Sequence, residues 1–269
     1  MHFFNWDLSQ SLKELSTHSL VAIKSEYEAE GIRRAELSAL SSACGYANIK
    51  QALKIGGCEA ITDLQDCFQP DIAYVVAPMI ETQYAAKKYI SAINSVSQPY
   101  SYQPDFLLNI ETSTSVNNLE SILEACATSP FIKGIVFGRV DYTFSLGLGR
   151  SSIASDQVAS AVLHAAQLVQ NYQLDFVVGG GISADSKPFL QELASIHLTR
   201  FETRKCVFDA SLIDQPDFDD VLRRAVRFEL LWLESKKSYY ETLALEDASR
   251  IAMLSRRHVY EITDGCDNL

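Results

Sequence analysis

Seven short apolar runs alternate with helix-like segments, and this alternation limits the possible folds more than any other feature of the chain. The runs lie near residues 20, 52, 72, 106, 134, 175 and 198. Continuous apolar runs are typical of parallel strands that are buried on both faces. Regular alternation with helices indicates a parallel sheet that helices cover. The sequence therefore predicts an α/β protein.

Seven strands of this kind favour a TIM-like (β/α)8 barrel with an atypical first or last strand. The eighth strand is expected either in residues 1–18 or at Cys206 to Phe208. The rival is a doubly wound open sheet, but the GxGxxG motif that usually follows its first strand is absent. We expect one domain over residues 1–269, with the barrel core at about 20–208.

The chain becomes helical after the barrel. From Asp217 to about Arg257, apolar residues recur at steps of three and four, which predicts one long helix or two shorter ones, and the tail from Thr263 is expected to be loose. Large apolar side chains such as Trp232 and Leu243 exceed what docking on one domain needs. We therefore expect a subunit contact and a homo-oligomer.

Charge and composition limit the classes of partner that the chain can bind. The net charge is −11, which argues against nucleic acid or an anionic membrane surface as a partner. No apolar run approaches the length of about 18 residues that a membrane-spanning helix needs, and the N-terminus lacks the pattern of a signal peptide. The six cysteines form no CxxC pair, which is typical of reduced thiols. These features predict a cytoplasmic protein with a small-molecule substrate.

Two carboxylates follow strands in one predicted βαβ unit, Asp105 to Arg150. Glu111 comes directly after the run Phe106 to Ile110, and Asp141 comes shortly after Gly138. Because the carboxyl ends of parallel strands share one face, both side chains should lie near each other at the face that carries active sites. Two carboxylates suit a hard divalent cation such as Mg²⁺ or Mn²⁺, whose other coordination positions stay open to water or substrate.

Further polar residues stand at other strand ends. Glu26 and Tyr27 follow the first run, Lys54 ends the second, and Glu202 follows the last. Glu202 and Arg204 are alternatively a surface ion pair, the commoner case. The loop 179–183 contains three consecutive glycines, whose backbone N–H groups are a weak indication of an anion site.

Two linked segments of the chain resemble a known family. FLLNIETSTSVNNLESIL followed by IKGIVFGRVDYTFSLG, together with VVAPMIETQYAAKKYI, resembles the HpcH/HpaI aldolase and citrate lyase β-chain family. The resemblance covers about residues 20–205 and is strongest from 72 to 150. It implies a TIM-like barrel, a divalent metal held by Glu111 and Asp141, and chemistry on pyruvate-like 2-oxo acids or acyl thioesters.

The chain departs from the family pattern at three positions. Lys54 stands where the aldolases have an arginine that contacts the 2-oxo acid, and it lacks the bidentate fork of arginine. Tyr27 follows Glu26 where the aldolases have the acid–base histidine, and Arg139 stands where proline is usual. We expect Lys54 and Arg139 to neutralise the substrate beside Gly138, and Glu26 or Tyr27 to relay protons.

The resemblance implies a metal-dependent carbon–carbon lyase or synthase of the aldolase type. It would act through a pyruvate-type enolate on a 2-oxo acid and an aldehyde or acyl partner. An acyl-CoA lyase of the citryl or malyl type is an alternative, ranked lower because no basic run marks a coenzyme A site. A barrel that has lost catalysis and serves as a binding or assembly subunit is a third.

Overall fold

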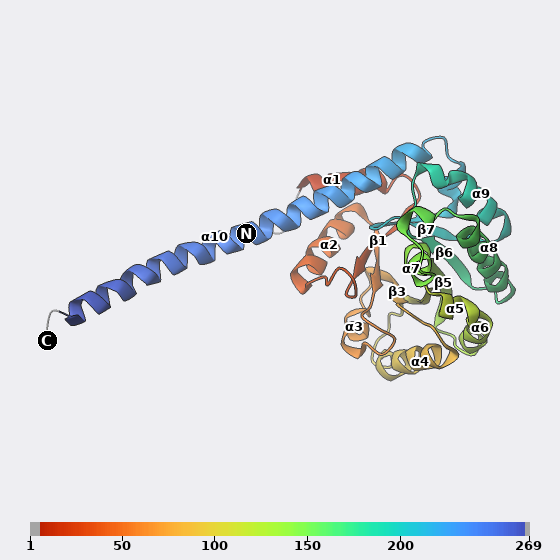
Figure 1. The fold of residues 1–269 in the computed structure, drawn as a ribbon, viewed down its shortest axis with the longest axis horizontal. Coiled ribbons are helices and arrows are strands. Elements are labelled where there is room, and N and C mark those ends of the chain that lie inside the picture. Colours follow the sequence, from red (N-terminus) through yellow and green to blue (C-terminus); the bar gives the residue numbers. More distant parts are fainter. Residues whose placement is uncertain (1–5, 267–269) are drawn as a thin grey trace.

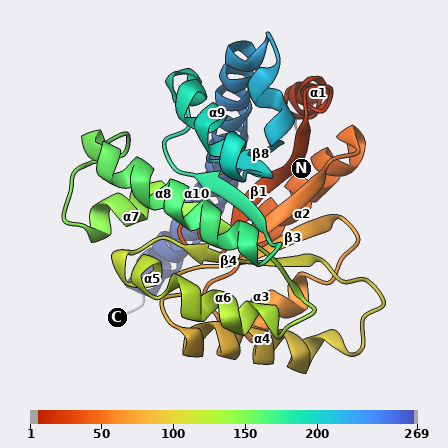
Figure 2. The same cartoon turned by 90° about the vertical axis from the view of Figure 1, so that its right-hand side faces the viewer.

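Eight strands form one closed barrel with helices around its outside (Figures 1 and 2). The computed structural model describes the backbone of residues 6–266 and the side chains of residues 6–258. The strands are β1 (Leu20–Glu26), β2 (Lys50–Lys54), β3 (Ile72–Ala77), β4 (Asp105–Ile110), β5 (Ile132–Gly138), β6 (Asp175–Gly179), β7 (Arg200–Glu202) and β8 (Cys206–Asp209). Neighbours in the barrel are neighbours in sequence, and β8 closes it against β1. The expected TIM-like barrel is confirmed.

The atypical strand is the last one. Strands β1 to β7 pair in parallel, whereas β8 is antiparallel to both β7 and β1. Strand β7 ends at Glu202 and β8 begins at Cys206, so the link is far too short for a parallel crossover, which needs a dozen residues or more. The eighth strand thus lies at the second of its two expected places. Residues 6–15 form a helix, and residues 1–5 lie outside the described part of the chain.

One helix precedes β1, and the others lie between strands. They are α1 (Trp6–Leu15), α2 (Arg34–Ala47), α3 (Ile61–Asp66), α4 (Gln83–Ser97), α5 (Ser113–Asn117), α6 (Leu119–Ala127), α7 (Arg139–Ser145), α8 (Asp156–Asn171) and α9 (Lys187–Ile196). The last parallel strand, expected near residue 198, begins at Arg200, and the apolar Ile196 belongs to the end of α9. Short apolar runs fit a helix end and a strand start equally well.

Side chains inside the barrel change from apolar to charged along the strands. One buried layer consists of Val76, Leu107, Val136 and Val177, and a second cluster consists of Ala22, Ala52 and Val207. Because alternate residues of a strand face the same side, the next inward positions are Lys24, Lys54, Asn109, Gly138 and Gly179. The apolar layers are therefore followed, at the carboxyl ends of the strands, by a layer of polar side chains and glycines.

A single helix, α10 (Phe218–Cys266), follows the barrel. Its first half packs on the body through Phe218, Val221, Ala225, Phe228 and Trp232, which are buried. The second half projects away from the barrel (Figure 1). The predicted helix from Asp217 is confirmed. It continues through the start of the tail that was expected to be loose from Thr263, and it ends at Cys266. The rest of that tail, residues 267–269, lies outside the described part of the chain.

Two further observations cover the described part of the chain. The five cysteines among its described side chains are free. Within residues 6–266, no helix has both the length and the apolar character that crossing a membrane requires.

Candidate active site

A cavity of about 890 Å³ opens where the parallel strands end. The final residues of five strands line it, namely Glu26, Lys54, Gly138, Gly179 and Glu202. Glu111, the first residue after β4, and Asp141, in the first turn of α7, line the same cavity. The two acids that the sequence singled out therefore reach one space, although 30 positions separate them.

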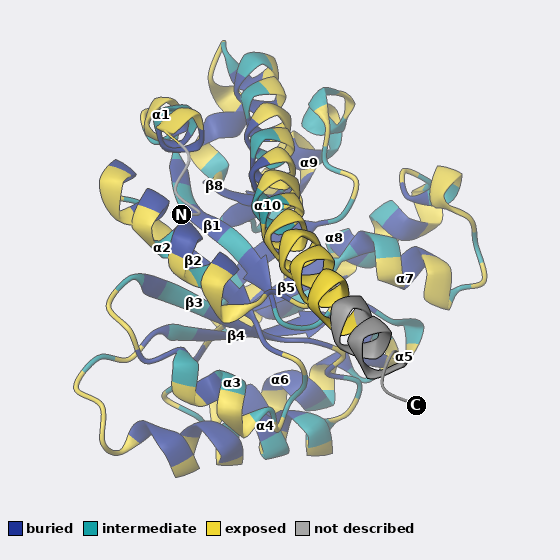
Figure 3. Ribbon diagram, turned by 90° about the vertical axis from the view of Figure 1, so that its left-hand side faces the viewer, coloured by how far each residue is buried: buried dark blue, intermediate teal, exposed yellow. Residues whose placement is uncertain are grey.

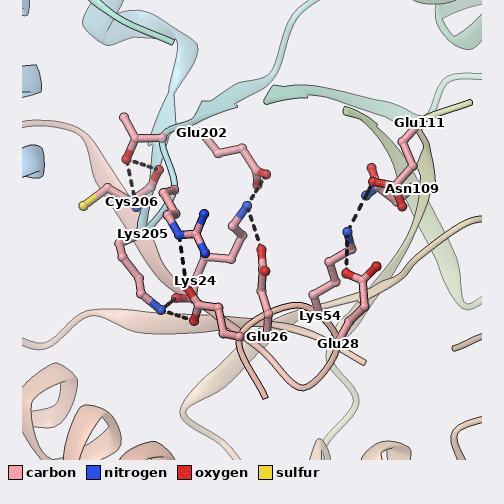
Figure 4. A network of polar contacts seen from close by, with 12 residues as sticks. Lys24, Glu26, Glu28, Lys54, Asn109, Glu111, Glu202, Lys205 and Cys206 are labelled. Carbon is pink, nitrogen blue, oxygen red and sulfur yellow. Dashed lines mark hydrogen bonds and ion pairs between the residues drawn. The ribbon is translucent and has the colours of Figure 1, made fainter. Parts of the chain in front are cut away.

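Glu111 lies at the bottom of this cavity and is only 1% exposed. Its Oε2 accepts hydrogen bonds from Lys54 Nζ at 3.2 Å and from the Asn109 amide (Figure 4). Its Oε1 accepts one from the Met79 N–H at 2.9 Å. Burial raises the pKa of Glu111, and the charge of Asp141 raises it further, against the opposing effect of Lys54.

Lys54 is held between two carboxylates. Its Nζ lies 2.8 Å from Glu28 Oε2 and 3.2 Å from Glu111 Oε2. Burial alone would lower the pKa of Lys54, but Glu111 and Glu28 raise it above the usual value. Lys54 is therefore an ammonium at neutral pH. If Glu111 bound a metal ion instead, Lys54 would still be paired with Glu28.

A second lysine, Lys24, forms ion pairs with two other acids of the cavity. Lys24 Nζ lies 2.6 Å from Glu202 Oε1 and 3.3 Å from Glu26 Oε1 (Figure 4). Burial would raise the pKa of Glu26, but Lys24 and Lys54 outweigh it and lower the pKa. Glu26 is therefore a carboxylate that faces the cavity. Glu202 is not the surface partner of Arg204, because it points inward to Lys24.

The charge balance of the cavity favours a cation. Seven carboxylates line it against five lysines and arginines, so a divalent ion would bring the lining to neutrality. Among the described side chains, no cluster of three or more His, Cys, Asp or Glu forms a complete metal cage. Mg²⁺ and Mn²⁺ need only one or two protein carboxylates, because water and substrate oxygens fill the other positions. Glu111 and Asp141 fit that requirement.

Tyr27 does not reach the cavity. It follows the inward-facing Glu26, so it points to the other side of β1, and its hydroxyl donates a hydrogen bond to Asp66 Oδ2 of α3 at 3.1 Å. Burial and the Asp66 carboxylate raise the pKa of Tyr27. This placement corrects the expectation that Tyr27 relays protons to a substrate.

We therefore expect Tyr27→Phe to leave the rate of the catalysed reaction close to that of the wild type. Removing the hydrogen bond to Asp66 should cost about 1 kcal/mol of stability. Steady-state kinetics and thermal unfolding of the same variant measure the two effects separately. A large loss of rate with an intact fold would show that Tyr27 takes part in catalysis.

Arg139 is also turned away from the cavity. It is 4% exposed, donates a hydrogen bond to the Gly180 carbonyl at 2.7 Å, and its guanidinium lies 4.9 Å from the centre of the Phe189 ring. Burial lowers the pKa of Arg139 to about 10, so it is charged at neutral pH. Arg139 therefore anchors the glycine loop that lines the cavity. The lining arginine nearest to it in sequence is Arg150.

Sequence reasoning missed Asn109. It is 5% exposed, lines the cavity and donates to Glu111, and its Oδ1 has no hydrogen-bond partner among the described residues. The signal was present, because Asn109 is a polar residue within an apolar strand and precedes Glu111 by two positions, which places both on one side.

A closed barrel whose ionisable side chains gather where the parallel strands end is the architecture of TIM-barrel enzymes. A family model described as HpcH/HpaI aldolase/citrate lyase matches residues 34–208, more than half of the chain. The chain belongs to this family. The family resemblance expected from the sequence is confirmed, and membership supports an enzyme of the aldolase and lyase superfamily.

Solved structures agree with this fold. An HpcH/HpaI aldolase from Desulfitobacterium hafniense is 12% identical, with a TM-score of 0.58 over 74% of this chain and 84% of that chain. An HpcH/HpaI aldolase/citrate lyase family protein from Burkholderia cenocepacia is 15% identical, with a TM-score of 0.58 over 86% and 92% of the two chains. The citrate synthase SbnG is 14% identical, with a TM-score of 0.56 over 86% and 90%. No curated protein matches the chain.

Proposed function

We propose that the protein is a divalent-metal-dependent carbon–carbon lyase or synthase that acts on a small 2-oxo acid through a pyruvate-type enolate. One observation carries the proposal: Glu111 and Asp141 line one cavity at the strand ends of a barrel from an aldolase and lyase family. These two residues would hold Mg²⁺ or Mn²⁺. When bound, the ion would stabilise the negative charge that develops on the 2-oxo oxygen.

The lysines and Glu26 have distinct roles in this proposal. Lys54, which is held as an ammonium by Glu28 and Glu111, neutralises the carboxylate of the substrate. Lys24 keeps Glu26 ionised, so Glu26 can accept a proton at its carboxylate. Gly138 leaves the space that a substrate beside Glu111 needs. Arg150, at the edge of the cavity, replaces Arg139 as the second cationic group for the substrate.

The second candidate is a binding or assembly subunit without catalysis. The placement of Tyr27 and Arg139 outside the cavity favours it, because two of the four expected catalytic side chains do not reach the substrate space. The ionised acids and lysines that line the cavity favour the enzyme.

Proton exchange at the methyl group of pyruvate in D₂O separates the two candidates. The enzyme should catalyse exchange with added Mg²⁺ or Mn²⁺, lose it with a chelator, and regain it when the metal is restored. Absence of metal-dependent exchange with pyruvate and other small 2-oxo acids would favour the binding subunit.

We expect Gly138→Ala to weaken metal binding about tenfold. A Cβ at this position would lie 2.9 Å from Glu111 Cβ and 3.0 Å from its Oε2, so the carboxylate must move. Gly149→Ala is the matched control, since a Cβ there meets no described atom within 4 Å. Titration with Mn²⁺ measures both. Equal affinities in the two variants would contradict the placement of the ion at Glu111.

A further inference from the structure

The loop between β1 and α2 is held largely by side chains. Backbone hydrogen bonds fix only its two ends. The N–H of Tyr27 donates to the Lys54 carbonyl at 2.8 Å. The N–H of Ile32 donates to the Glu26 carbonyl at 3.0 Å. Between these points, the backbone of residues 28–31 makes no hydrogen bond to another described residue, so the position of this segment depends on its side chains and their partners.

Two glutamates anchor the segment 28–31 on opposite sides of β1. On one side, Glu28 Oε2 lies 2.8 Å from Lys54 Nζ at the end of β2. On the other side, Glu30 Oε2 pairs with Lys205 Nζ, one position before β8 begins. Strands β2 and β8 are the two neighbours of β1 in the barrel. The segment is therefore held across the end of β1 by one ion pair on each side (Figure 4).

Lys205 is a buried cation outside the cavity. It is 2% exposed and is not among the described residues that line the cavity. Its Nζ lies 6.0 Å from the centre of the Trp232 ring, in the first half of α10, whose inner side is buried against the barrel (Figure 3). Among the described side chains, Glu30 is the only carboxylate that pairs with it. Because a buried charge without a partner is strongly destabilising, Lys205 holds Glu30 firmly in place.

We infer that Glu30 and Lys205 are positioning residues for the active site, because their ion pair fixes the segment 28–31 so that Glu28 reaches Lys54. The inference rests on the proposed function, in which Lys54 neutralises the carboxylate of the substrate. Glu28 and Glu30 are two positions apart, so their Cα atoms lie within about 7 Å of each other. Release of Glu30 would let the segment move, and Lys54 would lose the partner that keeps it in place beside Glu111.

Proton exchange of pyruvate at saturating Mn²⁺ measures this effect. Glu30→Gln should raise the KM for pyruvate about tenfold with a smaller change in kcat, because the substrate site loses order while the metal ligands stay. Glu28→Gln should raise the KM by a similar factor. If Glu30 acts through Glu28, the double variant should have a KM no higher than either single variant. A wild-type KM in Glu30→Gln, or effects that multiply in the double variant, would overturn the inference.

Asp175→Asn is the matched control for the loss of an ion pair. Asp175 pairs with Arg200 at 2.6 Å, and the two are the first residues of β6 and β7, at the opposite end of the barrel from the cavity. This variant should lose stability and keep the KM of the wild type. A similar rise in KM would mean that general loosening of the barrel causes the effect, against the inference.

Replacing both partners of the buried pair separates positioning from stability. Glu30→Gln alone leaves Lys205 buried without a carboxylate and should destabilise the protein. Glu30→Gln combined with Lys205→Met removes both charges and should regain most of that stability, which keeps the protein folded for kinetics. The KM should stay high, because the segment 28–31 still lacks its anchor. Recovery of the KM together with the stability would overturn the inference.

Urea unfolding of the Glu28 and Glu30 variants tests the same coupling without any activity. The two carboxylates pair with different lysines, so independent anchors would lose stability additively. If Glu30 positions Glu28, Glu28→Gln should cost less stability in the Glu30→Gln background than in the wild type. Equal costs in the two backgrounds would overturn the inference. Unequal costs in a protein that catalyses no exchange would support the positioning and reject only the proposed function.

Discussion

Replacing Glu111 by glutamine should slow metal-dependent proton exchange of pyruvate by about 100- to 1,000-fold while the protein stays folded. Glutamine keeps the size of glutamate and one of its two hydrogen-bond acceptors, but it removes the charge that would hold the cation. The Lys54 ammonium would then be paired with Glu28 alone. Exchange rates followed by proton NMR, with Mn²⁺ or Mg²⁺ at saturation, measure the effect.

The matched control is Glu81→Gln. Glu81 also follows a strand, but it accepts a hydrogen bond from Thr112 at 2.8 Å and is not among the described residues that line the cavity. Its replacement should leave the exchange rate almost unchanged. Similar losses in both variants would show that the effect comes from general damage to the strand ends.

Lys54→Met should have the second largest effect, on stability as well as activity. It leaves Glu28 and the buried Glu111 without their shared partner, and breaking a buried ion pair in this way costs roughly 3–5 kcal/mol. The Lys54 pKa is raised in the folded protein, so its contribution is fully present at neutral pH and is lost only when the pH rises through that pKa. Urea unfolding at pH 7 measures the loss.

Lys88→Met is the control for Lys54→Met. Lys88 pairs with Glu59 at 2.7 Å, but both side chains are well exposed, so the loss of stability should be much smaller than for Lys54→Met. Lys54→Met should also move the acid limb of metal binding to higher pH, because Lys54 lowers the pKa of Glu111. Equal stability losses in the two variants, or an unmoved acid limb, would contradict the role given to Lys54.

The barrel was predictable from the sequence because its parallel strands are continuous apolar runs. Strand β8 was harder to find, because Cys206–Asp209 is short and no helix separates it from β7. The exact start of β7 could not be read from the sequence, because the end of α9 and the start of β7 are both apolar and lie close together. The helix of α10 was predictable from its apolar spacing, but its projection beyond Tyr240 was not. The spacing does not say which apolar side chains pack on the barrel, and those at 243–258 are exposed.

The alternation of side chains along each strand explains which of the predicted site residues line the cavity. The residues at inward-facing positions line the cavity, namely Glu26, Lys54, Glu111 and Gly138. Tyr27 and Arg139 each come one position after an inward residue, so they face outward. Alternation within a strand is readable from sequence once the inward side is known. That side is fixed only by closure of the barrel, which no single strand reveals.

The central claim is that Glu111 and Asp141 hold one divalent cation together. Titration of the protein with Mn²⁺, followed by electron paramagnetic resonance, tests it directly in the wild type, Glu111→Gln, Asp141→Asn and the double variant. The account predicts one ion per chain, an affinity at least about tenfold lower in each single variant, and no binding at this site in the double variant. Binding of Mn²⁺ with unchanged affinity in either single variant would contradict it.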